Sequence, residues 1–167
     1  MPRRLLRDGR IVEDDWSYRA ESADAAALIL TFAEWQNEHA AWMARGGRLG
    51  VVLQPADKVE LLAPDISRLE LIGAQFSGPS EGRGYSQARV LREQWKFNGE
   101  LRATGFVRWD QLFFMARCGF NSFEMADADL EGAAEALSTF SAAYQPSNDA
   151  GLPFRLQHGR PGLPAGA

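Results

Sequence analysis

The sequence predicts an α/β protein built on a mostly parallel sheet of about five strands with alternating helices. Short apolar runs alternate with segments of helical periodicity, and glycine or proline residues separate them. The length of 167 residues and the content of 46% hydrophobic and 24% charged residues fit one ordinary globular domain. Such alternation implies parallel strands joined by right-handed crossovers. The sheet is either an open doubly wound sheet or half of a (β/α)8 barrel, because so few strands cannot close that barrel by themselves.

A β-hairpin is expected ahead of this alternation, over residues 5–12. Asp8 and Gly9 form a two-residue turn signal between the apolar pairs at residues 5–6 and 11–12. We expect the hairpin to cover an edge of the main sheet.

The remaining elements follow in order along the chain. Apolar runs predict strands over residues 27–30, 49–53, 69–76, 101–104 and 120–125. Helical spacing predicts helices over residues 35–45, 85–95, 109–118 and about 129–144, with Gly46, Gly47 and Gly119 as C-terminal caps. Residues 1–144 are therefore assigned to a single α/β domain. Residues 145–167 are rich in proline and glycine and are assigned to a C-terminal tail.

Charge and composition narrow the classes of function. The formal net charge is −4 and the pI about 5.2, whereas a nucleic-acid-binding protein needs a basic footprint. The only cysteine, Cys118, allows no intrachain disulfide. No run approaches the ~20 apolar residues of a membrane helix, and no apolar run follows the N-terminal charges as in a signal peptide. We expect a cytoplasmic protein that binds neither nucleic acid nor membrane.

The loop after the third predicted strand is the first candidate site. Ligands of parallel α/β folds bind outside the carboxyl ends of the strands, where helix N-termini favour anions. Gly82 and Gly84 permit a tight turn or a close approach to a ligand. Arg83 is a candidate clamp for a carboxylate, phosphate or sulfur oxyanion. Ser86 is either a helix cap or part of this anion site, and the alternative for Arg83 is a solvated charge.

The start of the next helix is the second candidate site. Arg108, Asp110 and Gln111 follow the fourth predicted strand. Asp110 is the candidate general base, although a first-turn carboxylate that stabilises the helix is the simpler interpretation. Gln111 is more easily explained as structural, and Trp109 either stacks on a ligand or partner or packs against the protein.

The sequence contains no recognisable metal or cofactor motif. Cys118 is placed at a helix C-terminus, where the dipole does not favour a thiolate, so core packing is expected. His39 and His158 lie far apart, and neither has a cysteine or carboxylate at ligand spacing. No flavin or nicotinamide fingerprint is present, because the glycine-rich loop lacks the required spacing.

Three stretches of sequence resemble the bacterial family catalogued as domain of unknown function 934. They are residues 82–92, residues 99–105, and residues 110–115 together with residues 118–120. The resemblance is densest from Leu69 to Met125. The family's pattern positions correspond to Gly82, Arg83, Gly84, Ser86, Gly105, Asp110 and Gln111.

The resemblance implies a genomic context and no established mechanism. Members are typically encoded beside the haemoprotein subunit of assimilatory sulfite reductase, and they carry labels such as oxidoreductase. This chain departs from the family pattern at Phe106, where an acid is usual, and at Trp109, where an arginine is usual. The neighbouring arginine, Arg108, lies one place earlier than the family's usual arginine. A shift of one residue along a helix turns the direction of a side chain by about 100°.

Three hypotheses follow. The chain is an accessory or electron-transfer partner of the sulfite reductase haemoprotein, and any redox centre would then be borrowed. Alternatively, it is a small enzyme that binds an anionic metabolite through Arg83 and moves a proton with Asp110. The third is a binding module whose half-barrel pairs with another copy, as a homo-oligomer.

Overall fold

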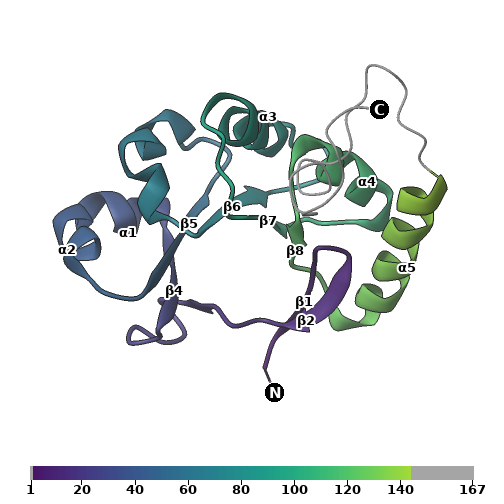
Figure 1. Ribbon diagram of the computed structural model, residues 1–167, viewed down its shortest axis with the longest axis horizontal. Helices are drawn as coiled ribbons and strands as arrows, with labels where there is room; N and C mark the ends of the chain where they lie inside the picture. Colours follow the sequence, from purple (N-terminus) through teal and green to yellow (C-terminus); the bar gives the residue numbers. More distant parts are fainter. Residues whose placement is uncertain (1, 144–167) are drawn as a thin grey trace, which may run out of the picture.

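The computed structural model describes residues 2–143 and contains one curled sheet of eight strands in the order β2-β1-β8-β7-β6-β5-β4-β3 (Figure 1). The strands are β1 (Arg4–Arg7), β2 (Arg10–Glu13), β3 (Ser17–Tyr18), β4 (Ala27–Thr31), β5 (Arg48–Leu53), β6 (Leu71–Phe76), β7 (Glu100–Gly105) and β8 (Ser122–Phe123). The helices are α1 (Phe32–Asn37), α2 (His39–Ala44), the 3-10 helix η1 (Val59–Arg68), α3 (Arg83–Arg89), the π-helical continuation η2 (Val90–Gln94), α4 (Trp109–Cys118) and α5 (Asp127–Ala143). The predicted tail, residues 145–167, lies outside the described residues.

The sheet is mixed, so the prediction of a mostly parallel sheet of about five strands is corrected. Strands β3 to β8 run parallel to their neighbours, but β1 pairs antiparallel with both β2 and β8. The predicted hairpin thus extends the sheet beyond β8 and covers that edge. The further strand β3 consists of two residues, which is too short to produce a periodic signal in the sequence.

The hairpin turn forms where its sequence predicts. Asp8 has a φ of 50° and Gly9 a φ of 77°, the left-handed backbone that a two-residue hairpin turn needs at both central positions. Leu6 pairs with Ile11 across the turn and lies in the core. The hairpin is therefore held both by its own turn and by burial of its apolar side chain.

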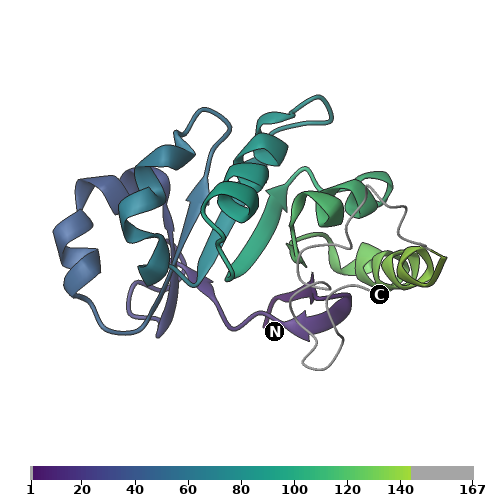
Figure 2. The same cartoon turned by 45° about the horizontal axis from the view of Figure 1, so that its top comes forward.

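The sheet curls into a half-barrel, with its helices on the outer side (Figures 1 and 2). Alternate side chains of each strand point to opposite faces. In β5, Leu49, Val51 and Leu53 join the main core beneath the helices, whereas Val52 joins a small second cluster on the concave face. Because the main core lies on one face, the half-barrel alternative holds and the doubly wound alternative does not.

A short connection between β2 and β3 crosses the concave face of the sheet (Figure 1). We call residues 14–16 the crossing segment. Trp16 is buried in the second apolar cluster, and the Arg48 guanidinium lies 4.5 Å above its ring. The segment fills space that, in a closed barrel, would be occupied by side chains of further strands.

Two predicted elements differ most from their predicted limits. The helix predicted over residues 35–45 is broken at Glu38, where φ is −118° and ψ is 28°. It begins earlier than predicted because Thr31 and Glu34 form a capping box. The strand predicted over residues 120–125 is only Ser122–Phe123. By contrast, α4 spans the predicted residues 109–118, and Gly119 is its C-cap as predicted, with a left-handed φ of 112°.

Candidate functional site

The two predicted site segments begin neighbouring helices. Strands β6 and β7 are parallel partners, so α3 and α4, which follow them, start at the same edge of the sheet (Figure 2). The two helices also touch, because the rings of Tyr85 and Phe114 lie 4.8 Å apart between centroids. We call this part of the molecule the carboxyl edge.

The side chains of Arg83 and Ser86 are both exposed at the carboxyl edge. Within residues 2–139 the Arg83 guanidinium has no hydrogen-bond or ion-pair partner, while its backbone N–H donates to Glu81. Helix α3 begins at Arg83, and its N-cap is Gly82, which offers no side chain. Ser86 therefore lies inside the helix, and its interpretation as an N-cap is wrong.

Gly84 and Gly105 are required by packing. A Cβ at Gly84 would lie 2.6 Å from Cζ of the buried Phe76, so the absence of a side chain lets α3 sit directly on β6. Gly105 has a φ of 79°, and a Cβ there would lie 2.4 Å from the Phe76 carbonyl oxygen. Gly82 differs from both, because a Cβ there would meet nothing within 4 Å.

Arg108, Asp110 and Gln111 lie together at the start of α4. Arg108 Nε is 3.7 Å from Asp110 Oδ1, and both side chains are exposed. The backbone N–H of Gln111 donates to the Arg108 carbonyl. Asp110 occupies the first turn of α4, as the helix-stabilising interpretation predicted. Burial is the main cause of the raised pKa of Tyr85 on α3, and the nearby Cys118 and Asp110 raise this pKa further.

Two large aromatic side chains on α4 are about half exposed. Trp109 is 48% exposed and Phe114 is 49% exposed. Trp109 lies against α5, because a Cβ at Gly132 would come within 1.7 Å of its ring. Phe114 lies against Tyr85 of α3. Each ring is thus held on one side by a neighbouring helix and exposed on the other.

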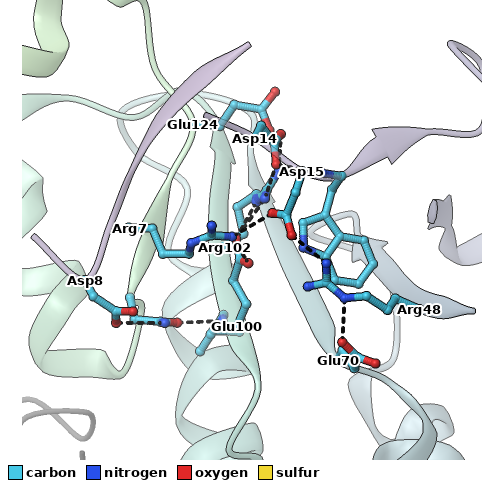
Figure 3. Close-up of polar contacts among 12 residues, drawn as sticks. Arg7, Asp8, Asp14, Asp15, Arg48, Glu70, Glu100, Arg102 and Glu124 are labelled. Atoms are coloured by element: carbon cyan, nitrogen blue, oxygen red, sulfur yellow. Dashed lines mark hydrogen bonds and ion pairs between the residues drawn. The ribbon is translucent and has the colours of Figure 1, made fainter. Parts of the chain in front are cut away.

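A buried ion-pair network on the concave face was missed by sequence reasoning (Figure 3). Arg102 of β7 is fully buried and donates two hydrogen bonds to Asp14, at 2.8 and 2.9 Å, and two to Glu100. Burial alone would lower the pKa of Arg102, but these carboxylates raise it. The available signal was the placement of Glu100 and Arg102 in an otherwise apolar strand, since charged residues are rarely buried unless paired.

The network continues to the amino ends of the strands. The Asp15 carboxylate accepts hydrogen bonds from both Arg7 and Arg48, and these arginines also pair with Glu100 and Glu70 respectively. A cleft of about 420 Å³ opens here, lined by Arg7, Asp8, Arg48, Leu69, Glu70, Gly99 and Glu100. This cleft lies at the edge of the sheet opposite the predicted site. Its arginines are engaged with its own carboxylates.

Further polar contacts lie where the parallel strands end on the concave side. The Tyr18 hydroxyl donates to Glu124 at 2.8 Å, and burial together with Glu124 raises the pKa of Tyr18. The Gln54 side-chain amide donates to Gln75. Arg3 also reaches Glu124, at 3.7 Å. The Tyr18–Glu124 contact thus joins β3 to the residue that follows β8, across the concave face.

Cys118 is the last residue of α4 and is buried, as expected for core packing. His39 Nε2 lies 2.7 Å from an Asp65 carboxylate oxygen. Among the described residues, no group of three His, Cys, Asp or Glu side chains is arranged to hold a metal ion. In the same part of the chain, no helix has the length and apolar character needed to cross a membrane.

The fold and the site define an α/β half-barrel protein with exposed aromatic and arginine side chains at its carboxyl edge. Comparison with protein families matches residues 50–155 to a family described as a bacterial protein of unknown function (DUF934). The match covers more than half of the chain, and the chain therefore belongs to this family, as the resemblance predicted. No curated protein matches the chain.

Proposed function

We propose that this chain is an accessory protein of assimilatory sulfite reduction that works by binding a partner protein, with the sulfite reductase haemoprotein as the candidate. The pathway comes from the family resemblance. The binding role is supported by one structural observation, the half exposure of Trp109 and Phe114 on α4. Exposed aromatic side chains on a folded surface are typical of protein interaction sites.

The state of the concave face also favours a binding role. Its central charges are paired with one another, and Asp14 and Arg102 are out of contact with solvent. Such a network holds the half-barrel together, and its charged groups are already engaged with one another. Arg83, whose guanidinium has no partner within residues 2–139, lies instead at the carboxyl edge, where a partner can reach it.

The experiment uses the unaltered chain and the purified haemoprotein. The two should co-purify and form a complex with a measurable Kd. A deletion strain should grow poorly on sulfate as the only sulfur source and normally on sulfide or cysteine. Normal growth of the deletion strain on sulfate, together with no complex at micromolar concentrations, would contradict the proposal.

A second candidate function, a small enzyme acting on an anionic metabolite, is favoured by the positions of Arg83 and Arg108. Both are exposed at the starts of neighbouring helices, and Asp110 lies beside Arg108. Here Arg83→Ala should abolish binding of the anion and leave the Tm within a few degrees. The matched control is Arg10→Ala, which removes an exposed arginine on β2. Equal binding by both variants would exclude Arg83 as the anion clamp.

A further inference from the structure

The outer surface of α3 and α4 combines aromatic rings with arginines. Phe114 contacts Tyr85, and Arg89 follows Tyr85 by one helical turn on the same side of α3. Arg89 is exposed and, among residues 2–139, its side chain has no hydrogen-bond or ion-pair partner. An exposed arginine without a partner therefore lies one helical turn from the aromatic pair.

The charge of this region is opposite to that of the whole chain. From α3 to the end of α4, the exposed cations are Arg83, Arg89, Lys96, Arg108 and Arg117, and the exposed carboxylates are Glu93 and Asp110. The chain as a whole has a formal net charge of −4. A local excess of positive charge on an acidic protein attracts a negatively charged surface from one side only, which fixes the orientation of approach.

We propose that this region is a docking surface for an acidic face of a partner protein. The docking surface consists of Arg83, Tyr85, Arg89, Arg108 and Phe114. The ring of Phe114 enters an apolar depression on the partner, and the arginines pair with carboxylates around it. Tryptophan, tyrosine and arginine are the residues that contribute most to binding at protein interfaces. This inference rests on the proposed function, because it specifies the partner's surface.

The observations favour a protein over a nucleic acid as the occupant. A nucleic acid is a polyanion that extends beyond the patch and would meet the excess of carboxylates elsewhere on the chain. The docking surface also borders on Asp110, which lies beside Arg108 and one turn from Phe114. A folded acidic surface of limited extent meets the arginines without meeting the rest of the molecule.

Photo-crosslinking in cells tests the docking surface. A photoreactive p-benzoylphenylalanine replaces Phe114 in the full chain, and mass spectrometry identifies the protein and the segment that are captured. The matched control places the same probe at Leu61 on η1, which is 47% exposed, close to the 49% of Phe114. Each probe is combined with Arg89→Glu, or with Arg10→Glu as the control for charge reversal at an exposed arginine outside the docking surface.

Capture from position 114 of an Asp- and Glu-rich segment of the haemoprotein would support both proposals. We expect Arg89→Glu to reduce that capture about tenfold or more, because a charge opposite the partner's carboxylates becomes repulsive, and Arg10→Glu to leave it unchanged. Capture of an acidic segment of a different protein, with the same dependence on Arg89, would support the docking surface and contradict the proposed function.

Other outcomes overturn the docking surface. Capture of the haemoprotein from position 61 and not from position 114 would leave the proposed function standing and remove this surface. Crosslinks from position 114 to nucleic acid, or to a protein segment without acidic residues, would show that the occupant is of another class. A yield from position 114 no higher than that from position 61 would show that nothing docks there.

Discussion

The Asp14 carboxylate is held in a two-point pair by the Arg102 guanidinium, with Nη2–Oδ1 at 2.8 Å and Nη1–Oδ2 at 2.9 Å, and both side chains are fully buried. The two residues are 88 positions apart in the chain. Burial alone would raise the pKa of Asp14, but the hydrogen bonds and charge of Arg102 hold it below its usual range. This pair ties the crossing segment to the centre of the sheet.

Asp14→Asn should lower the free energy of unfolding by roughly 3 kcal/mol, because removing one partner of a buried pair leaves the other charge poorly compensated. Urea unfolding measures this change. Glu70→Gln is the control, since it removes one carboxylate of an exposed pair with Arg48, and exposed pairs contribute about 0–1 kcal/mol. Equal effects of the two substitutions would mean that the Asp14–Arg102 pair does not hold the fold.

Asp15 should make stability depend on pH below about pH 4. Partial burial opposes ionisation of Asp15, but hydrogen bonds from Arg48 and Arg7 lower its pKa to about 2, against about 3.9 in an unfolded chain. A carboxyl group whose pKa is lower in the folded state stabilises that state at pH values above its pKa in the unfolded chain. This contribution to stability is lost as the pH falls towards 2. Unfolding midpoints of the unaltered chain and Asp15→Asn should therefore differ at pH 7 and converge by about pH 2. A gap that stays constant over this range would contradict the assignment.

Two glycines at the start of α3 should respond differently to substitution by alanine. Gly84→Ala places a Cβ against the buried ring of Phe76 and should destabilise by about 1–3 kcal/mol through overpacking. Gly82→Ala meets no atom within 4 Å at a backbone φ of −102° and should change stability by less than about 0.5 kcal/mol. Thermal unfolding of both variants checks the pair. A stable Gly84→Ala variant would show that packing does not require this glycine.

The effect of Gly132→Ala on stability should depend on the side chain of Trp109. Replacing a helical glycine by alanine usually stabilises by about 1 kcal/mol, but a Cβ at Gly132 would displace the ring of Trp109. Gly132→Ala should therefore stabilise the Trp109→Ala variant by more than it stabilises the unaltered chain. Equal gains in the two backgrounds, measured by urea unfolding, would mean that Trp109 does not lie on Gly132.

Local sequence signals predicted the parts of the candidate site that depend on neighbouring residues. The start of α4 at Trp109, its end at Gly119 and the edge shared by Arg83 and Asp110 follow from helix signals and from the rule that parallel strands end together. The role of Gly84 could not be predicted, because it depends on the ring of Phe76 in another element.

The pairing of two half-barrels into a homo-oligomer stays a prediction. Light scattering, which gives the mass of the particle in solution, checks it.

Hydrophobic periodicity and turn residues were enough to establish the α/β class, the order of the main strands and helices, and the hairpin around Asp8 and Gly9. Those features depend on interactions between residues close in the chain, and such interactions leave a pattern in the sequence. Folding in three dimensions established the mixed sheet, its curl and the pairing of Asp14 with Arg102. These depend on contacts between distant segments, where each partner is an ordinary charged or apolar residue until the chain brings the two together.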